Sequence, residues 1–452
     1  MSLPRYPKYK DSGSEWLGVV PVHWEVWKLA HAFEIIGSGT TPKTDKREYY
    51  DEGDIPWINT GDLDDGDLEN CDKRITTIAL ADHSSLRLYP AGSVLIAMYG
   101  ATIGKLAMLR FPATVNQACC VFAGTSPIVA KFMFFWFLGL RQQILSLATG
   151  GGQPNVSQDI LRTLRVGCPN QAEQTLIATF LDRETAKIDG LVAEQQRLIE
   201  LLKEKRQAVI SHAVTRGRNP NAPMKPSGIE WPTHVPADWT VKRIKHLVAD
   251  SGGIQMGPFG GMLLDLDSEE TGFKVFGQEN TISGNFCLGS RWISKGRFES
   301  LANYHIANGD LLLTRKGSLG NARLVQNLRQ PGIVDSDTIR IRVNGLLIMQ
   351  TFLALLLHEA RYVSEQITLS KRGAILPGLN SDTVANIAII LPPLDQQREV
   401  MGVLTKVTSE IDDSIGACEN ATNLLQERRT ALISAAVTGK IDVRGLVETE
   451  AA

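Results

Sequence analysis

The sequence predicts an α+β protein with two α/β domains, related by a pseudo-twofold axis and separated by two long antiparallel coiled-coil helices. Three observations support this fold class. An opening motif with two tryptophans and a proline occurs twice in the chain. Each occurrence is followed by short apolar runs between turn residues, which are typical of strands. Each of these regions is then followed by a segment with heptad-like apolar spacing, which is typical of a long helix.

The opening motif is the clearest evidence for a duplication. The pattern SG-x-EW-x4-P-x2-W runs from Ser12 to Trp24 and again from Ser227 to Trp239. Tryptophan is a rare residue, so two of them at the same spacing are not expected by chance. The match continues through glycine-containing segments and into the helices, as far as Thr215 and Thr438. A repeat of this length describes two whole domains, each followed by a helix, and not a solenoid.

Each α/β domain is predicted from short apolar runs bounded by Gly, Asp and Asn, followed by one buried helix. In the first copy the expected strands are residues 55–58, 93–98 and 115–122, and the buried helix is residues 131–147. In the second copy the expected strands are residues 273–276, 310–314 and 338–343, and the buried helix is residues 347–363.

The segment after each α/β domain predicts a long helix with an apolar stripe and charged residues on its other faces. The first stripe consists of Ile177, Leu181, Ile188, Leu191, Leu198, Leu202 and Val209. The second consists of Val400, Leu404, Ile411, Ile415, Leu425 and Leu432. Neither helix can bury its stripe alone, and the simplest partner for each is the other. Two unrelated surface helices are the alternative interpretation.

These patterns divide the chain into segments. The segments are an N-terminal arm (1–16), the first α/β domain (17–168), the first long helix (169–215), a linker (216–231), the second α/β domain (232–391), the second long helix (392–440) and a tail (441–452). The proline- and asparagine-rich linker resembles the N-terminal arm, with Lys10 opposite Lys225. We therefore expect the chain to begin and end at equivalent points of a near-circular arrangement.

Composition excludes several classes of protein. With 43% hydrophobic and 21% charged residues the chain is typical of a soluble globular protein, and no apolar run is long enough for a membrane span. The N-terminus lacks the apolar core of a signal peptide, and the six cysteines form no CxxC pair, which favours a reduced, cytoplasmic protein. A net charge of −2 is evidence against a protein that grips nucleic acid strongly on its own.

Several local patterns resemble one known family. The order of variable domain, long helix, variable domain and long helix is similar to that of the specificity (S) subunit of type I restriction–modification enzymes. The shared signatures are the two openings, the pattern GxxxGPFGGML from Gly253 to Leu263 and the Pro-Pro-x2-Gln-Gln helix start at 392–397. The first copy departs from the last two, with Cys168-Pro169-x3-Glu173-Gln174 and with SGTTP at 38–42.

The resemblance implies a function. Each α/β domain would be a target recognition domain that reads one half of a bipartite double-stranded DNA target. The helices would set the spacing between the halves and dock two modification (methyltransferase) subunits. Those subunits would use S-adenosylmethionine to methylate an adenine in each half, and restriction subunits with ATP- and Mg-dependent translocase and nuclease activities would join the complex. The chain itself would bind no cofactor and no membrane.

The sequence offers no convincing chemistry of its own. The segment from Gly100 to Lys105 has three residues between its glycines and Leu106 after the lysine, whereas a phosphate-binding P-loop needs four and a Ser or Thr. A methyltransferase motif of the Asn-Pro-Pro-Tyr type is absent, and no His or Cys spacing matches a metal site. Asp182, Glu184 and Lys187 suggest a nuclease triad only superficially, because they lie on one predicted helix. We expect no catalytic residue and no bound metal.

Candidates for DNA contact are polar or basic residues beside glycine turns, since such side chains can reach base edges and phosphates. In the first domain they are Thr40, Thr41, Lys43, Asn59, Thr60, Tyr99, Thr102, Lys105, Asn116, Gln117, Gln153 and Asn155. In the second domain they are Gln255, Gln278, Asn280, Arg315, Lys316, Ser318, Ser336, Lys371 and Arg372. The alternative for each is an ordinary polar loop residue.

Two other classes of function remain open on the sequence alone. A fused methyltransferase–nuclease would need a cofactor-binding domain, yet the duplication already uses the whole chain. A coiled-coil scaffold for an assembly without DNA would explain the helices but not the two diverged domains that precede them.

Overall fold

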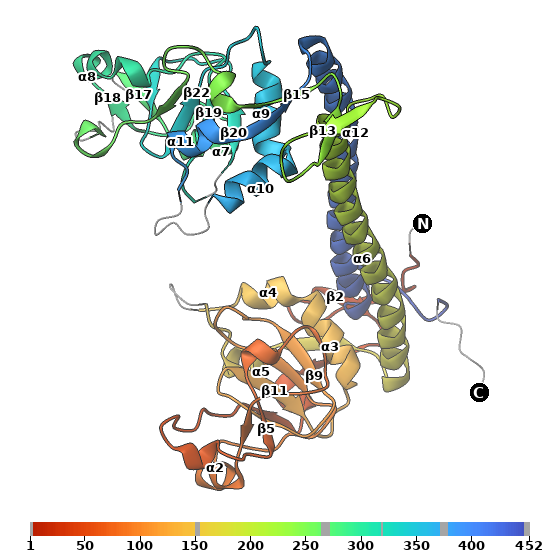
Figure 1. Ribbon diagram of the computed structural model, residues 1–452. Coiled ribbons are helices and arrows are strands. Elements are labelled where there is room, and N and C mark those ends of the chain that lie inside the picture. Colours follow the sequence, from red (N-terminus) through yellow and green to blue (C-terminus); the bar gives the residue numbers. More distant parts are fainter. Residues whose placement is uncertain (1–2, 150–153, 264–271, 318–319, 371–377, 447–452) are drawn as a thin grey trace. The chain divides into compact units, whose positions relative to one another are not determined.

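The computed structural model describes residues 3–149, 154–263, 272–317, 320–370 and 378–446. The chain forms two compact units (Figure 1). Unit 1 consists of residues 1–196 and 419–452, and unit 2 consists of residues 197–418. Each unit therefore contains one α/β domain, one half of the first long helix and one half of the second. In the part of the chain that the structure describes, no helix is long and apolar enough to cross a membrane.

The α/β domain of unit 1 is built on a five-stranded sheet. Its strand order is β4 (Ile35–Gly37), β11 (Cys119–Ala123), β8 (Val94–Ala97), β9 (Leu106–Leu109) and β6 (Gly66–Leu68), antiparallel except for the β6–β9 pair. Smaller sheets join β10 (Thr114–Val115), β5 (Ile55–Ile58) and β7 (Arg74–Ile75), β12 (Arg165–Cys168) and β3 (Glu25–Lys28), and β1 (Tyr9–Asp11) and β2 (Val19–Pro21). The helices are α1 (Leu29–Ala32), α2 (Thr77–Asp82), α3 (Ala130–Gly139), α4 (Arg141–Leu145) and α5 (Gln158–Thr163).

The α/β domain of unit 2 repeats this plan with fewer strands. Its main sheet has the order β16 (Ile254–Met256), β22 (Thr338–Ile341), β19 (Leu311–Thr314) and β20 (Ala322–Leu324). Smaller sheets join β18 (Trp292–Ile293), β17 (Phe273–Phe276) and β21 (Gly332–Val334), β15 (Thr240–Arg243) and β23 (Ala388–Leu391), and β13 (Met224–Pro226) and β14 (His234–Pro236). The helices are α7 (Gln278–Ser283), α8 (Lys295–Ser300), α9 (Gln350–Glu359), α10 (Arg361–Leu369) and α11 (Ser381–Asn386).

The central strands of unit 1 are buried on both faces, which explains their continuous apolar sequences. In β8, Val94 and Ile96 face the core that contains α3, whereas Leu95 and Ala97 face a second core on the opposite side of the sheet. Helix α3 contributes Phe132 and Trp136, both fully buried, to the first core. The sheet therefore forms a fixed central layer from which the loops extend.

The single buried helix expected in each domain is in fact two helices. The first copy breaks at Leu140, which has φ −113° and ψ 14°, and the second breaks at Ala360, which has φ −80° and ψ 117°. Both residues are buried, at 5% and 1% exposure, so the apolar pattern continues through each break. The prediction of one helix was wrong because a change of backbone direction inside a core leaves no mark on apolar spacing.

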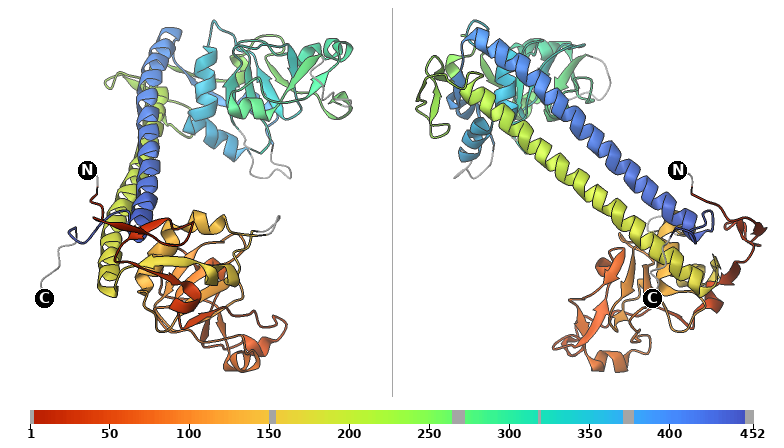
Figure 2. Two further views of the ribbon diagram at one scale, coloured as in Figure 1. Left: turned by 180° about the vertical axis from the view of Figure 1, so that it is seen from behind. Right: turned by 90° about the vertical axis from the view of Figure 1, so that its right-hand side faces the viewer.

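The two long helices are α6 (Gln171–Arg216) and α12 (Leu394–Val437). Their halves lie side by side within each unit (Figure 2). In unit 1, Arg183 donates to the carbonyl of Leu446 and Arg429 donates to Asp189. Unit 1 contains the start of α6 and the end of α12, and unit 2 contains the end of α6 and the start of α12, so the halves are antiparallel, as predicted.

Unit 2 contains the same antiparallel contact. Arg206 binds Asp412 at 2.9 Å, and Arg218 lies 3.8 Å from Glu399. Arg206 and Asp412 occupy the positions in the repeat that Arg429 and Asp189 occupy in unit 1. One ion pair thus occurs once in each unit, with the roles of the two helices exchanged.

The predicted apolar stripe of α6 is out of phase in its middle part. Leu191 and Leu198 are 53% and 41% exposed, whereas the neighbouring Val192 and Ile199 are half-buried and buried. Both series repeat every seven residues, so spacing alone could not distinguish them. The packed positions continue to Leu202, which the sequence analysis had identified.

Candidate nucleic-acid interface

The two units carry equivalent loop clusters, which are aligned by one glycine in each. A β-carbon at Gly39 would lie 1.7 Å from the carbonyl oxygen of Val115, and one at Gly257 would lie 1.7 Å from that of Asp335. Only glycine permits so close a crossing of two chain segments. We call these clusters the loop corners. The loop corner of unit 1 comprises residues 39–41, 99, 116–117 and 155, and that of unit 2 comprises residues 257–259, 315–316, 335–337 and 379.

The loop corner of unit 1 brings together six of the predicted contact residues. The Thr41 hydroxyl donates to Gln117 Oε1 at 2.7 Å, and both residues are exposed. Tyr99 pairs with Asn155 as an isolated bridge, and burial raises the pKa of Tyr99. The Trp57 indole donates a hydrogen bond to the carbonyl of Thr40 at 3.1 Å. The corner therefore presents hydroxyl and amide groups without a net charge.

The sixth of these residues, Asn116, supports the corner from inside, and other predicted residues lie beside the corner. Asn116 is 9% exposed, and its amide donates to Asn59 and accepts from the Ala118 backbone, so it joins two loops internally. Lys105 lies 2.9 Å from Asp64 and 3.7 Å from Asp65, so carboxylates offset its charge. The structure does not bring Lys43, Thr60 and Thr102 into the hydrogen bonds of the corner, and Gln153 lies outside the described residues.

The loop corner of unit 2 uses different side chains on an equivalent backbone. Arg315 donates to the carbonyls of Leu379 and Ser336, both at 3.0 Å. Its guanidinium lies 5.4 Å from the centre of the Phe259 ring, which is 48% exposed. Lys316 binds Asp337 at 2.7 Å.

Two of these residues, Phe259 and Asp337, were missed by the sequence analysis. A rule that selects polar residues beside glycine turns omits Phe259 because its side chain is apolar. Its position two residues after Gly257, inside the GPFGG pattern, was the available signal.

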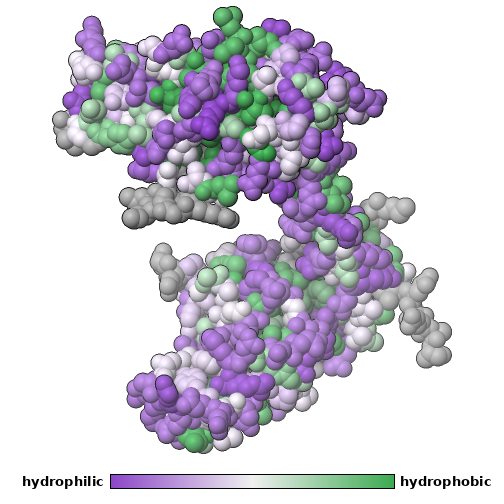
Figure 3. All heavy atoms as spheres, viewed as in Figure 1, coloured by the Kyte–Doolittle hydropathy of each residue, from purple (hydrophilic) through white to green (hydrophobic). Residues whose placement is uncertain are grey.

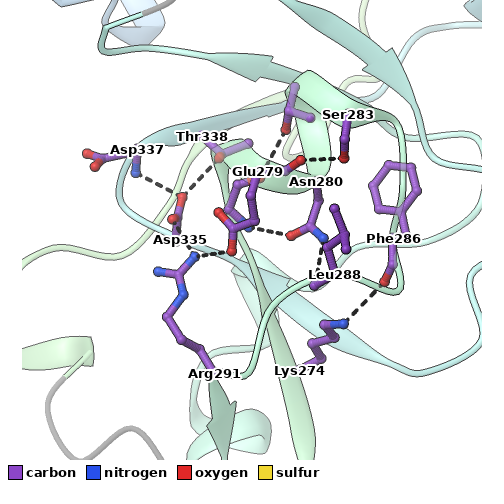
Figure 4. A network of polar contacts seen from close by, with 12 residues as sticks. Lys274, Glu279, Asn280, Ser283, Phe286, Leu288, Arg291, Asp335, Asp337 and Thr338 are labelled. Carbon is purple, nitrogen blue, oxygen red and sulfur yellow. Dashed lines mark hydrogen bonds and ion pairs between the residues drawn. The ribbon is translucent and has the colours of Figure 1, made fainter. Parts of the chain in front are cut away.

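One predicted contact in unit 2 is corrected by its burial. Asn280 is fully buried, and its side chain accepts from the Gly277 amide at 2.9 Å and donates to the carbonyls of Asn285 and Leu288 (Figure 4). Its amide caps α7 and fixes the following turn, so it is not available to DNA. Gln278 is half-buried at the start of α7, and Gln255 Nε2 donates to the carbonyl of Met256. Ser318, Lys371 and Arg372 lie outside the described residues.

A polar network around the buried Asp335 supports the loop corner of unit 2 (Figure 4). Arg291 binds Asp335 at 3.0 Å and Glu279 at 3.1 Å. Burial raises the pKa of Asp335, although Arg291 and the Thr338 hydroxyl oppose the shift. Because Asp335 immediately precedes Ser336, this network fixes the backbone of the corner. The sequence gives no periodic signal for it.

The residues that match between the two copies hold the scaffold. Gln174 accepts from the Val129 amide at 2.7 Å, and Gln397 accepts from the Met349 amide at 2.9 Å. Each glutamine is fully buried and also donates to two backbone carbonyls. These contacts tie the start of each long helix to the start of the buried helix of its domain.

The second tryptophan of each opening motif has the same kind of role. The Trp24 indole donates to Glu173, and the Trp239 indole donates to Gln396. The shared openings and helix starts are thus scaffold, and the loop corners are where the copies differ.

The chemistry of the corners suits recognition of base pairs. Hydroxyl and amide groups can donate to and accept from base edges, basic groups favour guanine, and an aromatic ring can contact a thymine methyl group. Among the described residues no group of three His, Cys, Asp or Glu side chains could hold a metal ion. Asp182 binds Lys131 and Glu184 binds Lys187, so these carboxylates are engaged in ion pairs at the helix surface.

Comparisons with known proteins agree with this arrangement. The profile of the type I restriction modification DNA specificity domain matches residues 21–201 and 236–416. The chain is 22% identical to the type I restriction enzyme MjaIX specificity subunit of Methanocaldococcus jannaschii, over 95% of this chain and 96% of that protein. It is 23% identical to the StySPI specificity subunit of Salmonella potsdam, over 95% and 92%.

Solved structures share the fold. A chain from a type I R-M system superposes with a TM-score of 0.71 at 14% identity, covering 92% of this chain and 98% of that one. The HsdS subunit from Thermoanaerobacter tengcongensis superposes with a TM-score of 0.52 at 14% identity, covering 93% and 98%.

Proposed function

Because this chain belongs to the type I restriction modification DNA specificity domain family, we propose that each of its units reads one half of a split DNA target through its loop corner. The chain is the DNA specificity subunit of a restriction–modification complex. One observation carries the proposal for the corners. The scaffold contacts of Gln174 and Gln397 match, whereas the side chains of the two loop corners differ. Matching scaffold contacts with different corner side chains are expected of two domains that recognise different DNA sequences.

The two corners favour different base contacts. In unit 1, Gln117 and Thr41 offer an amide and a hydroxyl, and a glutamine amide suits the donor–acceptor pair of adenine. In unit 2, Lys316 can donate to guanine if it exchanges Asp337 for a base, and Phe259 can contact a thymine methyl group. The Arg315 guanidinium donates two hydrogen bonds to backbone carbonyls, so we propose that Arg315 positions Phe259 and Ser336 and does not contact a base.

The partner subunits of the complex are part of the same proposal. We propose that this chain catalyses nothing and that two modification subunits carry S-adenosylmethionine and methylate adenine, while restriction subunits use ATP and Mg²⁺. Exposed leucines on the long helices support docking there. Leu201 and Leu424 occupy equivalent positions of the repeat and are 52% and 65% exposed. A pair of matching exposed leucines suits two copies of one partner.

Sequencing of methylated adenines in cells tests the proposal. Cells would express the chain with its modification subunit, either unchanged, with Thr41→Ala and Gln117→Ala, or with Phe259→Ala and Lys316→Ala. We expect each double variant to relax one half of a split motif and to leave the other half and the gap unchanged. Matched controls are Gln143→Ala and Gln330→Ala, which change exposed glutamines outside the corners. A change in both halves from one double variant would refute the assignment of one corner to each half.

The absence of catalysis is tested with the purified chain. Incubated with DNA and S-adenosylmethionine but without partner subunits, it should transfer no methyl group. Methylation by the chain alone would contradict the proposal.

A further inference from the structure

The opening motifs retain an acidic–aromatic pair that the scaffold buries only in part. Trp24 and Trp239 are buried at 0% and 1% exposure, so packing accounts for their presence in both copies. The first tryptophans of the motif behave differently, because Trp16 is 37% exposed and Trp231 is 42% exposed. Each follows an exposed glutamate, Glu15 or Glu230. Two diverged copies have therefore kept the same exposed pair, which points to a contact outside the chain.

In unit 1 the exposed tryptophan packs against the core on one side. The Trp16 ring meets Trp136 edge to face, with ring centres 5.4 Å apart, and Trp136 is fully buried in α3. A large side chain that already packs on one side loses less conformational entropy when a partner covers it than a fully exposed one does. Trp16 is thus suited to act as an anchor.

In unit 2 the equivalent tryptophan lines a cavity of about 700 Å³ between the opening and α10. The rim carries Trp231 and Leu369, both exposed. Arg361 and Glu365 also line the cavity and pair with each other at 2.8 Å. Because this pair neutralises itself, Glu230 leaves the rim with a net negative charge. The cavity therefore suits an apolar side chain with a basic group beside it.

We propose that Glu15–Trp16 and Glu230–Trp231 are two equivalent docking points for the modification subunit, with an apolar side chain of that subunit against each tryptophan and a lysine or arginine beside each glutamate. The inference rests on the proposed function, because it assumes two copies of that subunit. Tryptophan is enriched among the residues that dominate binding at protein interfaces. The glutamates disfavour DNA as the occupant, since carboxylates repel the phosphate backbone.

Binding of the purified modification subunit to the full chain tests the proposal. Native mass spectrometry gives the number of subunits bound, and titration gives the Kd of each step. We expect Trp16→Ala and Trp231→Ala each to weaken one of two binding steps by roughly 30-fold, as for a central interface tryptophan. The double variant should weaken both steps. Replacing the pair of glutamates by glutamine should reduce the dependence of binding on salt.

Matched controls separate docking from folding. Val22→Ala and Leu346→Ala truncate side chains that are 50% and 83% exposed, one in each unit, and should bind normally. The tryptophan variants should keep the circular dichroism spectrum of the unchanged chain, although Trp16→Ala should lower the melting temperature slightly because it removes the contact with Trp136. Trp16→Phe and Trp231→Phe should each restore most of the binding.

Three outcomes would overturn the inference. Two subunits bound by the double variant with unchanged Kd would refute docking while leaving the proposed function intact. No subunit bound by the unchanged chain would refute the proposed function itself. Self-association of the chain that the tryptophan variants abolish, measured by light scattering, would identify a second copy of the chain as the occupant.

Discussion

The hydrogen bonds of Gln397 predict how much the start of α12 contributes to the local stability of unit 2. The side chain is fully buried, accepts from the Met349 amide at 2.9 Å, and donates to the carbonyls of Leu347 at 3.2 Å and Pro392 at 2.9 Å. Gln397→Met keeps the volume and leaves these three backbone groups without that partner. At about 1 kcal/mol for each bond the loss is about 3 kcal/mol. Local opening should then become about 150 times more frequent.

Hydrogen exchange measured by mass spectrometry gives the local readout. Peptides that contain the Met349 amide should lose protection in Gln397→Met, while peptides from unit 1 should not change. Gln174→Met makes the reciprocal change, because Gln174 binds the Val129 amide in unit 1. Gln196→Met is the matched control, since Gln196 is exposed on α6. Unchanged protection at Met349, or an equal loss in both units, would refute the reasoning.

Three further predictions concern charge, pH and backbone. Arg206→Ala should destabilise unit 2 by about 2 kcal/mol, and Arg429→Ala should destabilise unit 1 by about 1 kcal/mol. The difference is expected because Arg206 also binds Glu359 at 2.8 Å, whereas Arg429 binds only Asp189 among the described residues. Equal losses of stability in urea unfolding would contradict this. Burial lowers the pKa of His358 below its ordinary value of 6.5, so the unfolded chain binds the proton more readily than the folded chain. Unit 2 should therefore lose stability as the pH falls from 6.5 to the folded pKa. His358→Gln should remove this dependence of the melting temperature on pH. Gly257→Ala places a β-carbon 1.7 Å from a backbone oxygen and should abolish reading of one half-site only; a normal methylation motif would show that the corner tolerates the crossing.

The duplication and the long helices could be predicted because they leave periodic or repeated marks. Matching tryptophans identified the copies, and the structure shows why Trp24 and Trp239 recur, since each binds the start of a long helix. The phase of the α6 stripe could not be predicted, because Leu191 and Val192 belong to series with the same seven-residue repeat. The tertiary neighbours of α6 select one series, and the spacing within α6 does not encode them.

The loop corners were predictable only in part. Polar residues beside glycines included Thr41 and Gln117, which the structure brings together. The same rule selected Asn280, which is buried, and omitted Phe259, which is exposed. Whether a loop residue points outward depends on which neighbour satisfies its hydrogen bonds, and for Asn280 the partners include the turn that follows α7. Local sequence does not contain that choice.

The composition of the units has a consequence for synthesis on the ribosome. Unit 2 is a continuous stretch of chain, whereas unit 1 needs both ends, because Ile433, Val437 and Val443 from the C-terminal part complete its core. The first domain to emerge is therefore the last to be finished. At roughly 5 to 20 residues per second it waits about 10 to 45 s with part of its apolar surface open. During this interval Phe180 and Leu181 of α6 lack their neighbours from α12. Chaperones should therefore bind the N-terminal half of the nascent chain more than its C-terminal half.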